Sequence, residues 1–203
     1  MADKLCAKCG ALNVANASSC SACGAQELRE GSFLRLSMGR VVLLSVLASG
    51  LYFFYWLYLT WKHLQSETRE VHHPFWHALT LFVPVYGLFR LHKHVRVIQG
   101  LALGVGVETS LAPGLAVVLV ALNMVLGLGS TRVESLTGLL LLNIISLALT
   151  TTVIAWSQDG LNRYWSRARG TALRDASMRA GERVIILVGI ALWINVLWTY
   201  LSA

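Results

Sequence analysis

Five long stretches of this 203-residue chain contain no Asp, Glu, Lys or Arg. They cover residues 41–61, 71–89, 109–131, 135–158 and 184–203, and each is between 19 and 24 residues long. A helix needs about 20 apolar residues to cross the hydrocarbon core of a bilayer. The chain is 56% hydrophobic and 13% charged, which excludes disorder, collagen, a coiled coil and a disulfide-rich secreted scaffold. The sequence therefore predicts an all-α membrane protein.

The expected membrane domain covers residues 38–203. It contains about five transmembrane helices, at about 38–61, 75–91, 111–130, 136–157 and 183–201. The second of these is short and Pro84 interrupts it, so a re-entrant or interfacial helix is the alternative there. Between the fourth and fifth helices, apolar residues recur at helical spacing among arginines, which predicts an amphipathic helix on the cytosolic side.

The four cysteines all lie near the N-terminus, in two Cys-x-x-Cys-Gly motifs. They are Cys6, Cys9, Cys20 and Cys23. Two-residue spacing lets one tight turn aim both thiolates at the same point, and two such turns supply the tetrahedral sulfur ligands that suit zinc. Residues 1–26 contain too few apolar side chains for a core, so bound metal would supply their folding energy. We predict a structural Zn²⁺ ribbon over 1–26 and a connector over 27–37, with iron or a redox dithiol as the alternatives.

The distribution of basic residues predicts the orientation. With a cytosolic N-terminus, 14 of the 17 Lys and Arg lie on the cytosolic side, and Lys62, Arg69 and Arg132 lie outside. The positive-inside rule favours this arrangement. We therefore expect a multi-pass protein of the inner (cytoplasmic) membrane of a bacterial cell, with the C-terminus outside. This arrangement also explains the net charge of +7 without nucleic acid, which is not an expected partner.

The basic segment before the fifth helix is the candidate contact with lipid or a partner. Its candidate residues are Arg163, Arg167, Arg169 and Arg174, with Trp165 among them. Each basic residue close to an anionic bilayer contributes about 1 kcal/mol of attraction. An ordinary positively charged cytosolic loop is the alternative interpretation.

One asparagine lies in each of the last three expected helices. These residues are Asn123, Asn143 and Asn195, and helix geometry places them at a similar depth. Hydrogen bonds between transmembrane helices contribute about 0.6–2 kcal/mol each. The three amides are therefore expected to stabilise helix packing, and a polar substrate site is the alternative.

Several of these motifs resemble known bacterial proteins. The double Cys-x-x-Cys-Gly resembles the short N-terminal zinc ribbons of many bacterial membrane proteins. The aromatic run Tyr52–Trp61, the segments Pro74–Trp76 and Leu88–Arg90, and the element Gln158–Asn162 resemble small uncharacterised multi-pass families, the domains of unknown function. This resemblance implies an architecture and a location, and it implies no reaction.

The expected function is a non-enzymatic interaction, scaffold or regulatory module, which docks a protein partner or anionic lipid at the cytosolic face. The bilayer is the expected environment, and a second copy of the chain is a further candidate partner. The alternative is a small transporter, channel or lipid-handling protein, and a membrane enzyme comes third. All ten acidic residues lie outside the charge-free stretches, which argues against proton-coupled transport and intramembrane aspartyl proteolysis. We predict no catalytic residue.

Overall fold

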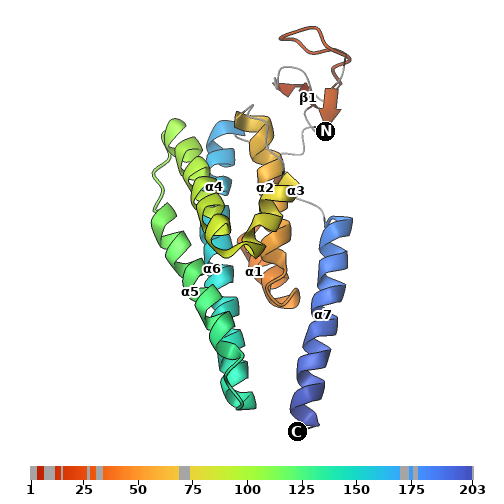
Figure 1. Cartoon of the computed structure of the whole chain (residues 1–203). Helices are drawn as coiled ribbons and strands as arrows, with labels where there is room; N and C mark the ends of the chain where they lie inside the picture. Colours follow the sequence, from red (N-terminus) through yellow and green to blue (C-terminus); the bar gives the residue numbers. More distant parts are fainter. Residues whose placement is uncertain are drawn as a thin grey trace.

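The computed structural model describes residues 4–6, 12–14, 16–26, 28–30, 34–68, 74–169, 174–175 and 178–202. A small sheet near the N-terminus sits beyond one end of a helical bundle (Figure 1). We call this end of the bundle the amino end. The opposite end, which holds the 131–135 connection and Leu201, is called the carboxyl end.

The N-terminal sheet has three short antiparallel strands. The central strand β1 (Lys4–Cys6) pairs with β2 (Leu12–Asn13) on one side and with β3 (Leu28–Glu30) on the other. The sheet therefore extends past residue 26, into the predicted connector. A second, parallel pair joins β4 (Leu34–Arg35) to β5 (Arg174–Asp175), next to the amino end.

Three helices are long and apolar enough to cross a membrane. They are α5 (Pro113–Ser130), α6 (Leu136–Arg169) and α7 (Ala180–Leu201), with mean hydropathies of 1.9, 2.1 and 2.2 over their most apolar 18 residues. They contain the last three predicted crossings. However, α6 runs without a break into the Arg-rich segment, so the predicted separate amphipathic helix is instead the last three turns of α6.

The first predicted crossing, 38–61, is wrong because the chain bends in its middle. Helix α1 (Met38–Leu47) ends at a turn, and α2 (Tyr52–Thr68) leaves that turn in a new direction. Ser49 and Gly50 form the turn with φ angles of 49° and 81°. Left-handed residues stop a helix, and glycine adopts this conformation without steric cost. Leu36, before α1, and His63, late in α2, line the same small cavity, so the two helices form a hairpin that returns to the amino end.

The second predicted crossing, 75–91, is also divided. It contains α3 (Pro74–Leu79), the 3₁₀ turn η1 (Thr80–Phe82) and the start of α4 (Pro84–Gly104). Pro84 occupies the first turn of α4, where its fixed φ and missing N–H are tolerated. The ring of Trp61 lies 4.7 Å from the rings of both His77 in α3 and His94 in α4. These helices therefore also form a hairpin, as the re-entrant alternative predicts.

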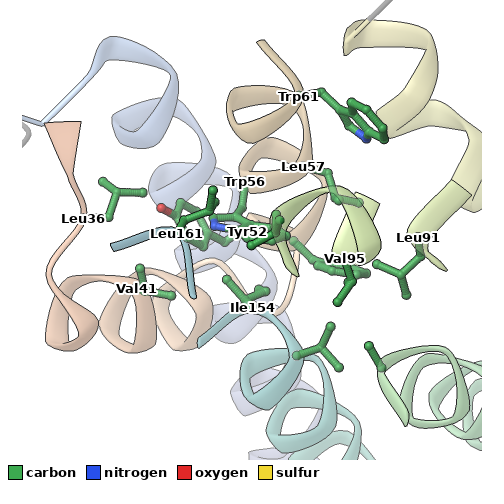
Figure 2. Close-up of a cluster of buried hydrophobic side chains, with 14 of the residues drawn as sticks. Leu36, Val41, Tyr52, Trp56, Leu57, Trp61, Leu91, Val95, Ile154 and Leu161 are labelled. Carbon is green, nitrogen blue, oxygen red and sulfur yellow. The ribbon is translucent and has the colours of Figure 1, made fainter. Parts of the chain in front are cut away.

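The hydrophobic core lies in the amino half of the bundle. Figure 2 shows side chains of α1, α2, α4 and α6 meeting around Trp56, which is fully buried. Helix α7 contributes little to this core, because only 6% of its most apolar 18-residue stretch is buried within the protein. The C-terminal parts of α5 and α7 and the N-terminal half of α6 extend beyond the hairpins toward the carboxyl end of the bundle as apolar, exposed helices (Figure 1). Helices that are apolar on every side are typical of segments surrounded by lipid.

Helix α7 is attached to the bundle mainly through the α1–α2 hairpin. Gly189 lies directly against the backbone of Ala48, and Gly181 lies against the ring of Tyr55. The indole N–H of Trp193 donates a hydrogen bond of 2.9 Å to the carbonyl oxygen of Val46, in the last turn of α1. Small residues let two helix backbones approach closely. The tip of the hairpin therefore reaches only halfway along α7.

Candidate functional site

A hollow of about 750 Å³ at the amino end brings basic side chains from distant parts of the chain together. We call it the basic hollow. Its lining residues are Arg35, Ser37, Met38, Val107, Asp159, Asn162, Arg163, Ser166 and Arg167. The α6 residues in this set recur every three or four positions, so they occupy one face of the helix. The other wall is the segment that leads from β4 into α1.

A chain of hydrogen bonds fixes the floor of the basic hollow. The indole N–H of Trp56 donates to Oε1 of Gln158 at 2.8 Å, and Nε2 of Gln158 donates to Oδ1 of Asn162 at 2.9 Å. Nδ2 of Asn162 then donates to the carbonyl oxygen of Leu36 at 2.7 Å. This chain links α2, α6 and the start of α1. It therefore holds Arg35 beside the arginines of α6.

The electrostatics of the basic hollow favour an anion. Among the described residues that line it are three arginines and one carboxylate, Asp159, whose Oδ2 accepts a 2.7 Å bond from Nε of Arg163. The side chain of Arg163 is 59% exposed and that of Asp159 is 42% exposed, so solvent weakens their attraction. Ser37 caps the N-terminus of α1, where the helix dipole is positive. A planar guanidinium group can bind two oxygens of a phosphate or carboxylate at once.

The predicted contact residues do not all lie in the basic hollow. Arg163 and Arg167 line it, and their contact with lipid or a partner stays a prediction. Trp165 is 3% exposed and packs against Tyr164, so it belongs to the core and not to a contact surface. The side chains of Arg169 and Arg174 lie outside the described residues. Sequence reasoning missed Arg35 and Ser37, because no local pattern shows that the connector folds back onto α6.

A buried ion pair joins the starts of α1 and α7. Nη2 of Arg40 lies 2.5 Å from Oε2 of Glu182, and the same oxygen accepts a 2.7 Å bond from the backbone N–H of Arg179. The Glu182 side chain is inaccessible to solvent, and the Arg40 side chain is 17% exposed. This carboxylate therefore holds the first turn of α7 next to the first turn of α1.

His63 lies next to this junction. Its Nε2 is 3.5 Å from Nη2 of Arg179. Burial, followed by the positive charges of Arg179 and Lys62, lowers the pKa of His63 to about 4. The imidazole is therefore neutral near pH 7, when it can accept a hydrogen bond from the guanidinium group.

The second cysteine motif forms a tight turn of the kind that a zinc ribbon needs. Cys20 is buried, Cys23 is exposed, and Gly24 has a φ of 70°. Nδ2 of Asn13 donates to Sγ of Cys20 at 3.6 Å. Cys9 and the side chain of Cys6 lie outside the described residues, and the described part of the chain contains no cluster of three potential metal ligands. The metal site therefore stays a prediction.

A cavity of about 310 Å³ lies beneath the tip of the α1–α2 hairpin. We call it the tip cavity. It is lined by Ser49 and Gly50 of the tip, by η1, by the first half of α6, and by the middle parts of α5 and α7. Asn123 and Asn143 both line it, whereas Asn195 is exposed on α7 and is not among the described residues that line it. Two of the three predicted asparagines therefore come together.

Each of these two amides makes one hydrogen bond, although Asn143 is an exposed residue of α6 and Asn123 is half-buried. The hydroxyl of Ser146 donates to Oδ1 of Asn123, which joins α6 to α5. Nδ2 of Asn143 donates to the carbonyl oxygen of Leu139 at 2.9 Å, within α6. The predicted interhelical bond is thus made by Asn123 with a serine and not with a second asparagine.

Comparisons of the chain with protein-family models, with curated proteins and with solved structures found no match. The resemblance to ribbon-bearing bacterial membrane families therefore remains a prediction. The function has to be argued from the geometry of the chain itself.

Proposed function

We propose that this chain is an integral membrane protein whose basic hollow docks the phosphate of an anionic phospholipid at the cytosolic face. The observation that carries the proposal is the convergence of Arg35, Arg163 and Arg167 on one hollow. This hollow lies at the end of a bundle whose three long helices could cross a bilayer. The role is that of a non-enzymatic interaction or regulatory module.

The distribution of charge supports a cytosolic amino end. Among the basic residues in the described part of the chain, Arg132 is the one that lies in the connection at the carboxyl end. The α1–α2 hairpin returns to the amino end of the bundle, so Lys62 lies at that end. The sequence instead predicts Lys62 outside. The positive-inside rule then favours an inner-membrane protein with a cytosolic N-terminus and an external C-terminus.

The N-terminal segment acts in this proposal as a structural zinc ribbon. Cys6, Cys9, Cys20 and Cys23 would hold the metal, whose binding would supply the folding energy of the ribbon. We expect Cys9→Ser to lower the bound zinc in metal analysis and to loosen the ribbon, while the helices stay inserted in the membrane. Loss of membrane insertion in that variant would contradict the independence of the two modules.

Lipid titration of the purified full chain in detergent tests the headgroup site. Phosphatidylglycerol should bind more tightly than phosphatidylcholine in native mass spectrometry. Arg163→Gln and Arg167→Gln should each weaken phosphatidylglycerol about 5-fold, because each basic residue contributes about 1 kcal/mol. Arg132→Gln is the matched control at the carboxyl end and should change nothing. Equal losses in all three variants, or binding of phosphatidylcholine with the same affinity, would refute the proposal.

A protein partner is the other outcome of this experiment. If phosphatidylglycerol binds wild type and the Arg163→Gln/Arg167→Gln variant alike, the hollow is not a lipid site. Loss of a co-purifying protein from that variant, and not from Arg132→Gln, would then assign the hollow to protein docking.

A further inference from the structure

We propose that the tip cavity binds the hydroxyl headgroup of an uncharged lipid, such as a diacylglycerol. This proposal does not depend on the basic hollow, which lies at the amino end of the bundle. It rests on the depth of the cavity, on the chemistry of Asn123 and Asn143, and on the apolar surfaces that continue from the cavity toward the carboxyl end.

The depth of the tip cavity indicates that its ligand is a lipid, which enters from the bilayer. Asn123 precedes the end of α5 by seven residues, and Asn143 follows the start of α6 by seven. At 1.5 Å per residue, both amides lie about 10 Å from the carboxyl end of these helices. The helices that surround them are the candidate membrane spans. A ligand therefore reaches the cavity most directly from within the bilayer.

The polar groups of the tip cavity match an uncharged ligand. None of the described residues that line it carries a formal charge. A charged headgroup would therefore lie at this depth without a counter-ion, which costs several kcal/mol. Phosphate and ammonium headgroups are disfavoured for this reason.

The two asparagines offer a donor and an acceptor to the same cavity. Oδ1 of Asn123 accepts from Ser146, and among the described residues its Nδ2 has no acceptor, so it can donate to a ligand. Nδ2 of Asn143 donates within its own helix, and among the described residues its Oδ1 has no donor, so it can accept from a ligand. A hydroxyl group both donates and accepts hydrogen bonds. An alcohol headgroup can therefore satisfy both amides at once, which a hydrocarbon chain cannot do.

The size and the surroundings of the tip cavity fit a headgroup and not a whole lipid. Its volume of about 310 Å³ is at the small end of the range for ligand sites. The acyl chains would then follow the apolar surfaces toward the carboxyl end, where Leu128 of α5 and Leu197 of α7 are 74% and 59% exposed. Irregular backbone at membrane depth is tolerated where it lines such a cavity, as Ser49 and Gly50 do.

Photolabelling of the full chain in phosphatidylcholine nanodiscs tests the proposal. The probe is a diacylglycerol with a diazirine on one acyl chain, and phosphatidylglycerol with the same labelled chain is the charged comparison. We expect the diacylglycerol to label residues 120–124 and 143–150 more strongly than the phosphatidylglycerol does. Asn143→Leu should reduce this labelling about 5-fold, the effect of one lost hydrogen bond. Asn195→Leu makes the same change at an exposed residue of α7 that is not among the described lining residues, and it should leave the labelling unchanged.

Competition on the wild-type chain keeps the test independent of folding defects in the variants. Unlabelled diacylglycerol should compete with the probe, whereas the analogue with its hydroxyl capped as a methyl ether should compete about 5-fold less well. Equal competition by the two compounds would overturn the proposal. Equal labelling by the charged probe would also overturn it, and so would equal labelling of Asn143→Leu and Asn195→Leu.

Discussion

The ion pair between Arg40 and Glu182 allows a quantitative test of how the α1–α2 hairpin holds α7. Replacing Arg40 with Gln would leave the carboxylate of Glu182 without its counter-ion in a site that solvent does not reach. Removal of one partner from a buried ion pair typically costs about 3–5 kcal/mol. The backbone N–H of Arg179 still donates to Glu182 and offsets part of this loss. We therefore expect Arg40→Gln to lower the free energy of unfolding by about 3 kcal/mol.

The double variant separates the ion pair from the packing of its two side chains. Arg40→Leu with Glu182→Leu leaves no uncompensated charge and should cost less than Arg40→Gln alone, because a buried pair can be replaced by apolar residues at little net cost. Reversible unfolding in mixed micelles, followed by tryptophan fluorescence, measures both values. The coupling energy then follows from the double-mutant cycle.

The exposed pair of Arg163 and Asp159 is the matched control. Its side chains are 59% and 42% exposed, so Arg163→Gln should cost at most about 0.5 kcal/mol. If Arg40→Gln proves no more destabilising than Arg163→Gln, then the junction at Glu182 is not buried as described. A coupling energy near zero would lead to the same conclusion.

Two further changes test the contacts of α7 and of His63. Gly189→Ala would place a methyl group 2.3 Å from the Cα of Ala48, so it should destabilise the chain by about 1–3 kcal/mol in the same unfolding assay. The control is Gly127→Ala, which has nothing within 4 Å of the added carbon and should be neutral or stabilising. The pKa of His63 is about 4 when folded and about 6.5 when unfolded, so the unfolded chain binds more protons between these values and stability falls with acidification. A drop from about pH 7.5 to about pH 5 should cost about 2 kcal/mol in wild type and much less in His63→Gln, and equal losses in both would show that another group titrates.

The sequence predicts the last three crossings well because continuous apolarity and helix propensity agree over each of them. The predicted segments 136–157 and 183–201 lie within α6 and α7, and 111–130 coincides with α5 except for Leu111 and Ala112, which precede it. The first two segments are also apolar but each is divided by a bend in the structure, since apolarity does not determine the direction of a chain. Glycine is common in transmembrane helices, so Gly50 alone does not predict a turn. The bend also depends on contacts of α1 with distant residues, such as the bond from Trp193 to Val46.

The expected sides of the two chain ends stay a prediction, which does not depend on whether five or three helices cross. Five crossings and three crossings are both odd numbers, so either arrangement puts the N-terminus and the C-terminus on opposite sides.

The candidate site is predicted only in part, because one of its walls is set by local spacing and the other by long-range contacts. The helical spacing of Arg163 and Arg167 is a local property of α6, whereas the approach of Arg35 depends on the buried hydrogen bonds of Gln158 and Asn162.

The bend at Ser49 and Gly50 also bears on how the chain is inserted during synthesis. The stretch 41–61 has the length and apolarity of a stop-transfer signal when it leaves the ribosome. If the insertion machinery passed it straight through, every later segment would be threaded with the opposite polarity, and the arginines around residue 163 would have to be exported. The bend at these two left-handed residues therefore decides which of two opposite orientations the later segments take in the membrane. Lengthening the helix through this bend would be expected to yield a mixed, dual-topology population.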